Sequence, residues 1–212
     1  MPGYACVRAP FFNNLTMFYL NIFDSMEQCT PEEVQRLLPL VSEQRRQEAL
    51  KFKHLLGQYC CLKSYVMLHE MLVEHGLVAE TCRPEFERNA HGKPELKDIP
   101  GVYFNLSHTK LAIAVAIGDH PVGVDVEGFK QPTERLLHYT MNEEEIGRVQ
   151  QAEHPEQAFA TLWTQKEAVF KYNGTGINSS IKELLTEIPL GVVMESSLNL
   201  EKGYALTLVR VE

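Results

Sequence analysis

The chain has 212 residues and is 44% hydrophobic, which is enough to bury a core as one large domain or as two small lobes. Its 20 basic and 28 acidic residues give a formal net charge of -8. That charge argues against broad nucleic-acid binding and against docking to an anionic membrane surface. A partner that carries phosphate must therefore meet a local basic patch.

The cysteines and the apolar segments indicate a cytoplasmic protein. No two cysteines have the Cys-x-x-Cys spacing of zinc or redox sites, so reduced thiols are the simplest interpretation. The first residues lack the basic start and apolar run of a signal peptide, and the longest apolar run, residues 111–117, is too short to span a bilayer. The five cysteines are Cys6, Cys29, Cys60, Cys61 and Cys82.

The first part of the chain is predicted to contain one strand and two helical regions. Aromatic and branched residues predict a strand over residues 16–23, and Thr30, followed by proline and two acids, is typical of a helix start. A longer helical region is expected over residues 42–74, with a break for which Gly57 is a candidate. This region holds the densest positive stretch, which is either a solvated helix face or a phosphate contact: Arg45, Arg46, Lys51, Lys53 and Lys63.

The middle of the chain combines a loop with a predicted hairpin. Residues 83–100 are rich in proline and glycine, and Pro94 favours an extended backbone at Lys93, which is expected to project from a stiff loop. Two strands, over residues 102–106 and 111–117, are joined by a short polar connection that contains Ser107 and His108. These polar residues either close a turn or contribute to a site.

Residues 122–127 alternate valines with acids. On a strand this pattern sends the valines to one face and Asp125 and Glu127 to the other, where the two carboxylates lie about 6–7 Å apart. Such a pair can converge on one hard cation, with Mg²⁺–oxygen contacts near ~2.1 Å. The alternative is a solvated acidic face on an edge strand.

The C-terminal part is predicted to be helical and then to end in strands. A short helix is expected over residues 132–139, a capped helix from Asn142, and the strongest helix over residues 155–172. The glycines after Asn173 predict its end, and the segments 192–193 and 204–211 predict closing antiparallel strands. On the strongest helix four residues share one stripe, either as part of a site or as an ordinary Glu–Lys pair beside a core aromatic: Trp163, Glu167, Phe170 and Lys171.

Four segments together resemble, in order and spacing, the motif set of the surfactin-type 4'-phosphopantetheinyl transferases. The segments are Gly92-Lys93-Pro94, Phe104-Asn105-Leu106-Ser107-His108, Val122-Gly123-Val124-Asp125-Val126-Glu127 and Trp163-Thr164-Gln165-Lys166-Glu167-Ala168-Val169-Phe170-Lys171. The resemblance implies transfer of the phosphopantetheine arm of coenzyme A to a serine of an apo acyl carrier protein or peptidyl carrier domain. The other product is adenosine 3',5'-bisphosphate.

The resemblance also implies the roles of the residues that carry the chemistry. Asp125, Glu127 and Glu167 would hold Mg²⁺ at the pyrophosphate. Glu167 would also act as the general base for the carrier serine, either directly or through a water molecule. Lys171 would steady the phosphates, with Lys166 as a helper.

For coenzyme A the resemblance implies a second set of contacts: Arg45, Lys93, Ser107 and His108. The chain departs from the family pattern at Cys60, which occupies a place where an arginine often grips the 3'-phosphate. Lys53 and Lys63 are the candidates to replace that arginine.

The fold implied by the resemblance is an α+β pseudo-dimer within one chain. Two similar lobes, residues 1–110 and 111–212, would each contain an antiparallel sheet and a long helix, with the active site in the cleft between them. Such a chain is expected to work as a monomer, without nucleic-acid or membrane partners. Which carrier protein it serves cannot be predicted from any of the motifs.

Two other functions use some of the same residues. A different Mg²⁺-dependent phosphoryl-transfer enzyme or hydrolase would use the acids but has no role for Lys93 together with Ser107 and His108. A non-catalytic module that binds carrier proteins or coenzyme A would tolerate the loss of Glu167, which is present along with Lys171.

Overall fold

The structure is a computed structural model that describes residues 16–174, 181–186 and 188–212. Its N-terminal half combines a three-stranded antiparallel sheet with helices and a small hairpin. The sheet has the order β1 (Phe18–Phe23), β5 (Ile113–Gly118), β4 (Tyr103–His108), and we call it the N-terminal sheet. The other elements are α1 (Pro31–Leu37), α2 (Glu43–Leu50), α3 (Leu55–Glu74), the 3-10 helices Met26–Gln28 and Leu38–Leu40, and the hairpin of β2 (Phe86–Arg88) and β3 (Pro94–Leu96).

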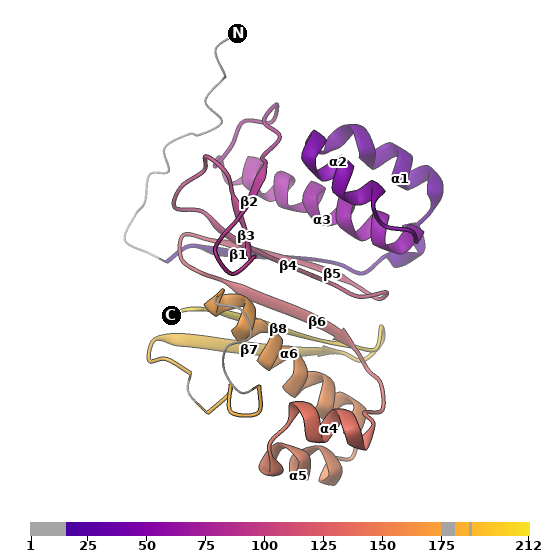
Figure 1. Cartoon of the computed structure of the whole chain (residues 1–212), viewed down its shortest axis with the longest axis vertical. Coiled ribbons are helices and arrows are strands. Elements are labelled where there is room, and N and C mark those ends of the chain that lie inside the picture. Colours follow the sequence, from indigo (N-terminus) through magenta and orange to yellow (C-terminus); the bar gives the residue numbers. More distant parts are fainter. Residues whose placement is uncertain (1–15, 175–180, 187) are drawn as a thin grey trace.

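The C-terminal half repeats the combination of a three-stranded antiparallel sheet with a long helix. The sheet, which we call the C-terminal sheet, has the order β6 (Gly123–Gly128), β8 (Tyr204–Val211), β7 (Val192–Asn199). The helices are α4 (Glu134–Thr140), α5 (Glu143–Gln151) and α6 (Pro155–Asn173). Figure 1 shows the strands in the middle of the molecule, with α1–α3 at one end and α4 and α5 at the other. The α+β fold with antiparallel sheets, expected from the sequence, is confirmed.

The central strand β5 holds the two halves together because its two faces serve different cores. Ile113, Val115 and Ile117 pack into the cluster that contains α3. The alternate residues are small and face the other way, where Ala112, Ala114 and Ala116 pack against the valines of β6 and side chains of β8. Alanines allow the two sheets to approach closely, so the fold stacks one sheet on the other.

Most helices begin and end at residues that the sequence marks. The side chains of Thr30, Ser42 and Asn142 each accept a hydrogen bond from a backbone N–H in the first helical turn, and Asn142 forms a capping box with Glu145. Helix α6 ends at Gly174, whose φ of 63° lies in the left-handed region that favours glycine. The predicted starts of α1, α2 and α5 and the end of α6 are therefore confirmed.

Several expectations are corrected. Gly57 does not break the long helical region: it lies in the first turn of α3, and the break falls at residues 51–54. Residues 83–100 are not wholly irregular, since they contain the β2–β3 hairpin. The five thiols are not all reduced, because Cys82 is disulfide-bonded while Cys29, Cys60 and Cys61 are free.

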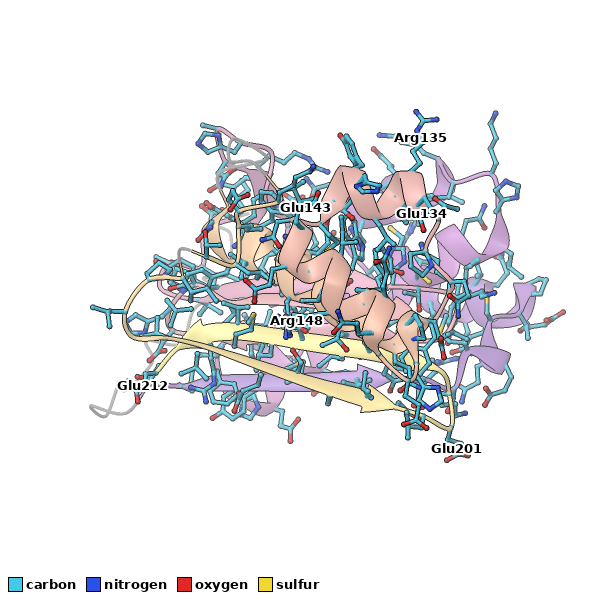
Figure 2. All side chains as sticks on the ribbon, turned by 90° about the horizontal axis from the view of Figure 1, so that it is seen from below. Glu134, Arg135, Glu143, Arg148, Glu201 and Glu212 are labelled. Carbon is cyan, nitrogen blue, oxygen red and sulfur yellow. The ribbon has the colours of Figure 1, made fainter. Side chains whose placement is uncertain are left out.

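The division at residue 110 stays a prediction. Strand β5 pairs with β1 and β4, whereas β6 pairs with β8, so the sheet grouping of the described strands changes at residues 119–122. Figure 2 looks onto α4 and α5 from below, where the charged side chains of Glu134, Arg135, Glu143 and Arg148 mark these two helices. None of the helices in the described ranges is long and apolar enough to cross a membrane.

Candidate active site

The site begins with a close approach of helix α6 to strand β6. A Cβ atom at Gly123 would lie 2.0 Å from the carbonyl oxygen of Ala168 and 2.6 Å from the backbone nitrogen of Tyr172. Only glycine allows this separation, so the glycine in the strand motif lets the helix backbone rest on the strand. The approach brings the helix side chains beside the acidic face of β6.

Asp125 is the central charged residue of this contact. It is buried, and its Oδ1 atom accepts hydrogen bonds from Ser107 Oγ and from Lys171 Nζ, each at 2.7 Å. The lysine contact is an ion pair between α6 and β6. The other oxygen, Oδ2, is buried and has no hydrogen-bond partner among the described residues. Among the described residues, Oδ1 therefore accepts two hydrogen bonds and Oδ2 accepts none.

Polar side chains from β4 fix the free edge of β6. Asn105 Oδ1 accepts a hydrogen bond from the backbone N–H of Val124 at 3.0 Å, and Ser107 Oγ accepts one from that of Val126 at 3.2 Å. Ser107 thus connects β6 and Asp125 with the N-terminal sheet. Its buried hydroxyl is used for this purpose, and the sequence predicted instead a contact with coenzyme A.

Burial and the charge of Asp125 raise the pKa of two more carboxyl groups, those of Glu127 and Glu167. Burial and then the Asp125 carboxylate raise the pKa of Glu127, while Lys130, Trp163 and Lys171 act in the opposite direction. Burial and Asp125 also raise the pKa of Glu167, which Lys171 partly offsets. Asp125, Glu127, Glu167 and Lys171 therefore influence one another electrostatically, and we call them the acid cluster; the site roles expected for them stay predictions.

This cluster is not a ready-made metal cage. In residues 16–174, 181–186 and 188–212, no three His, Cys, Asp or Glu side chains converge closely enough to hold an ion. Two observations nevertheless fit a cation: the unpartnered Oδ2 of Asp125, and the raised pKa values of Glu127 and Glu167. A positive ion here would satisfy the free oxygen and relieve the repulsion between the acids.

A basic cavity of about 480 Å³ lies beside the cluster, between α2, α3 and β4. Arg45 is held in its wall by hydrogen bonds to the carbonyl oxygen of Cys61 at 2.9 Å and to Ser64 Oγ at 3.1 Å, and by an ion pair with Glu48 at 3.1 Å. The acidic and basic residues that line the cavity are Arg45, Glu48, Lys51, Arg88 and His108. Its excess of positive charge suits a phosphate group.

His108 links the cavity with the acid cluster. Desolvation, Lys171 and Arg45 lower the pKa of its imidazole, and Asp125 acts weakly in the opposite direction. Because the ordinary pKa of histidine is about 6.5, the ring is neutral at pH 7. A neutral imidazole can donate and accept hydrogen bonds at the same time.

Of the residues considered for the 3'-phosphate contact, Arg45 lines this cavity, whereas Cys60, Lys53 and Lys63 do not. Cys60 is fully buried and burial raises the pKa of its thiol to about 12, so it supplies no charge. Lys63 Nζ lies 4.3 Å from the centre of the Phe23 ring, and neither Lys53 nor Lys63 is among the residues that line the cavity. Arg88, which also lines the cavity, was not predicted as a site residue; the signal that could have found it is a basic residue shortly before Gly92-Lys93-Pro94.

Two predicted coenzyme A contacts have their ammonium groups engaged elsewhere. Lys166 is fully buried, pairs with Glu145 at 2.9 Å and donates to the carbonyl oxygens of Ile181 and Lys182. Lys93 Nζ donates to the carbonyl oxygen of Lys171 at the end of α6. Neither placement supports a contact with coenzyme A.

The comparisons with known proteins identify one family. The family model for the 4'-phosphopantetheinyl transferase superfamily matches residues 121–208, which contain β6 and α6. The 4'-phosphopantetheinyl transferase psf-1 of Bacillus pumilus is 30% identical over 160 residues, covering 74% of this chain and 68% of the relative. The enzyme Sfp of Bacillus subtilis is 25% identical over 150 residues, covering 69% of this chain and 66% of the relative.

A further match is shorter. The 4'-phosphopantetheinyl transferase AcpT of Salmonella typhimurium is 34% identical over 97 residues, which is 43% of this chain and 50% of the relative. With the Bacillus relatives, the match spans about two thirds of their length. The chain therefore belongs to the 4'-phosphopantetheinyl transferases of the surfactin type, a class of transferases.

Proposed function

We propose that the chain transfers the 4'-phosphopantetheine group of coenzyme A to a serine of an apo acyl carrier protein or peptidyl carrier domain, with Mg²⁺ as cofactor. The products would be the holo carrier protein and adenosine 3',5'-bisphosphate. The observation that supports this best is the acid cluster of Asp125, Glu127 and Glu167 around Lys171, in a chain that belongs to the family. The basic cavity beside it supplies a place for a phosphate.

Asp125, Glu127 and Glu167 are the residues that would hold Mg²⁺. When bound, the ion would neutralise the pyrophosphate and the charge that develops on the transferred phosphoryl group. Asp125 supports this assignment because its Oδ2 atom has no hydrogen-bond partner in the part of the chain that the structure describes, while Ser107 holds Oδ1 in place. The hydrogen bond from Ser107 thereby orients the carboxylate.

Glu167 is the proposed general base. It is half-buried on α6, and its raised pKa makes it a stronger proton acceptor than an ordinary glutamate. A serine hydroxyl held within hydrogen-bond reach, directly or through one water molecule, would lose its proton to this carboxylate as the oxygen attacks phosphorus.

Lys171, Arg45 and His108 are the proposed phosphate contacts. The Lys171 ammonium lies against Asp125, one turn along α6 from Glu167, where it can move onto a phosphate oxygen. Arg45 and His108 line the basic cavity, and burial and then the charges of Lys171 and Arg45 lower the pKa of His108, so a phosphate near His108 would be close to positive charge. Positioning and charge stabilisation would supply most of the rate acceleration.

The test is incubation with coenzyme A, Mg²⁺ and several apo carrier proteins, followed by measurement of the intact mass of each carrier. A mass gain of one phosphopantetheine group supports the proposal and reveals the preferred carrier. No gain with any acyl or peptidyl carrier, under conditions in which psf-1 modifies the same samples, would refute it.

Matched variants separate the competing functions. Asp125→Asn should abolish transfer, whereas Asp119→Asn, at an acid in the turn that precedes β6, should not. Hydrolysis of coenzyme A without transfer would favour a different phosphoryl-transfer enzyme. Binding of carriers with equal affinity by the wild type and Glu167→Gln, and no mass gain in either, would favour a non-catalytic module.

The remaining expectations stay predictions. These are the two-lobe division with the site in the cleft, the monomeric state, the cytoplasmic location, and the lack of nucleic-acid and membrane partners. Mass photometry in the presence of coenzyme A would test the monomeric state directly.

A further inference from the structure

The turn between β2 and β3 holds the last turn of helix α6. Lys93 Nζ donates a hydrogen bond to the carbonyl oxygen of Lys171 at 2.5 Å and lies 3.4 Å from that of Tyr172. A Cβ atom at Gly174 would lie 2.9 Å from Lys93 Cδ, so the lysine stem packs on the glycine that ends the helix. Lys93 is thus joined to Lys171 and Tyr172, which lie 78 and 79 positions further along the chain.

Asn89 makes the same turn rigid and adds a second contact. Its Oδ1 atom accepts hydrogen bonds from the backbone N–H groups of His91 and Lys93 at 2.9 and 3.0 Å. Its Nδ2 atom lies 3.4 Å from the carbonyl oxygen of Gly174. One asparagine therefore shapes the turn that presents Lys93 and also contacts the end of α6.

The contact is electrostatically favourable. The last carbonyl groups of a helix have no partners within the helix and carry partial negative charge, which a nearby cation stabilises. The only basic residue in the last turn of α6 is Lys171, whose ammonium is paired with Asp125. Lys93 supplies the missing charge from another part of the chain. Its half-burial lowers the pKa of the ammonium, which Glu95 partly offsets.

The position of the clamp connects it with catalysis. Lys93 binds the backbone of Lys171, and the side chain of that residue meets Asp125 on β6. Glu167 lies one helical turn earlier on the same helix. Fraying of the last turn would move the Lys171 ammonium, because a carbonyl and a side chain of one residue move together.

We propose that Lys93 is a positioning residue: from the β2–β3 turn it clamps the last turn of α6 and so sets where the Lys171 ammonium lies relative to Asp125. The alternative is that Lys93 binds a ligand, since it also lines a cavity of about 320 Å³ with Tyr172 and Gly174. The link with catalysis rests on the proposed function, but the clamp itself does not. The two roles predict different measurements.

The test compares Lys93→Met, which keeps the length of the side chain but removes the donor, with Asn89→Ala and with Lys97→Met as the control. Lys97 follows β3 in the same hairpin and pairs with Glu85 at an exposed position. Hydrogen exchange of residues 164–174, followed by mass spectrometry, should accelerate about tenfold in Lys93→Met, because the variant loses the hydrogen bond from a charged donor to the end of the helix. Asn89→Ala should show a smaller acceleration, and Lys97→Met should match the wild type.

Coenzyme A binding and turnover provide the second readout. Calorimetry should give a Kd for coenzyme A within about twofold of the wild type in Lys93→Met, while kcat falls by about tenfold or more. Lys93→Arg, which keeps the charge and the donors, should recover most of kcat. A Kd that rises about tenfold with unchanged hydrogen exchange would overturn the clamp and make Lys93 a ligand contact.

The outcomes also separate this inference from the proposed function. If the wild type binds no coenzyme A, the proposed function fails, but the exchange of residues 164–174 still decides whether the clamp exists. If Lys93→Met does not fold, Asn89→Ala carries the exchange test, since it removes the hydrogen bonds that shape the turn and present Lys93 to the end of α6. Unchanged exchange in that variant would then count against the clamp.

Discussion

Asp125 sets the charge balance of its neighbours. Its carboxylate is buried, shares one oxygen between Ser107 and Lys171, and raises the pKa of Glu127 and Glu167. In the free protein these acids repel one another more than Lys171 compensates. Burial and this repulsion make the charged forms of Glu127 and Glu167 unfavourable in the folded protein, and a cation bound among the acids, as proposed above, would relieve that cost.

The first prediction concerns Glu167→Gln, which should lose transfer but gain stability at about pH 8. The folded-state pKa of Glu167 is raised, so the folded state binds more protons than the unfolded state between the ordinary and the raised value. The free energy of unfolding therefore falls as pH rises through that interval. We therefore expect the Tm of Glu167→Gln to lie above that of the wild type at about pH 8.

Two controls make this prediction specific. At about pH 4 or below, where the carboxyl is protonated in both states, the Tm difference should vanish. Mg²⁺ should raise the Tm of the wild type more than that of Glu167→Gln. A variant that is less stable than the wild type at about pH 8 would show that Glu167 has a structural role.

At the scale of elements, the contact between α6 and β6 decides whether the site forms. Sequence periodicity places Glu167 and Lys171 on one stripe, and the strand motif places Asp125 on one face, but neither pattern brings the two elements together. Gly123 does so, because its missing side chain lets the helix backbone reach the strand.

The second prediction is that Gly123→Ala destabilises the fold and impairs transfer. The added methyl group would overlap the carbonyl oxygen of Ala168, and overpacking of this kind costs about 1–3 kcal/mol. Urea unfolding measures the loss. The control is Gly147→Ala in the middle of α5, where an added Cβ meets nothing within 4 Å. It should stabilise the chain by about 0.5–1 kcal/mol. Equal stability of Gly123→Ala and wild type would contradict the close packing.

The third prediction concerns Lys166, whose buried ion pair joins α6 to α5. The ammonium also holds the carbonyl oxygens of Ile181 and Lys182, and Glu145 belongs to the capping box of α5. Lys166→Met should therefore cost about 3–5 kcal/mol of stability, because it leaves the Glu145 charge buried without a partner. Urea unfolding at constant pH measures this loss.

A second substitution distinguishes a structural role from a cofactor contact. Lys166→Met combined with Glu145→Gln removes both charges but keeps a side chain that suits the capping box, so most of the lost stability should return. If Lys166→Met kept full stability and raised the KM for coenzyme A, the expectation from the sequence would be correct and the structural role wrong.

At the scale of the whole molecule, the two sheets are joined by packing and by a polar seam. Alanines of β5 meet valines of β6 in the middle, and side chains of β4 bind the free edge of β6. Near the ends, Tyr204 OH donates to Asp24 Oδ2 at 3.1 Å. The seam also carries Ser107, so the same contacts that join the halves orient Asp125.

The fourth prediction is that Asn105→Ala weakens the junction of the sheets. The change leaves the backbone N–H of Val124 buried without its acceptor, which costs about 1–3 kcal/mol. We expect a lower urea midpoint and a reduced kcat, because β6 carries Asp125. The control is Asn21→Ala at an exposed position of β1, which should stay within about 0.5 kcal/mol of the wild type. Equal effects at both sites would show that the seam contributes nothing.

The sequence determined the local structure and the choice of acids. Caps at Thr30, Ser42 and Asn142 and the alternation of valines are local signals, so they survive in any fold and were predicted correctly. Only the tertiary structure decided how the polar groups are used, because hydrogen-bond partners come from segments far apart in the chain. The side chains of Lys93, Lys166 and Ser107 suit a phosphate, but each binds a partner within the protein. Lys93 donates to the carbonyl oxygen of Lys171, Lys166 pairs with Glu145, and Ser107 donates to Asp125.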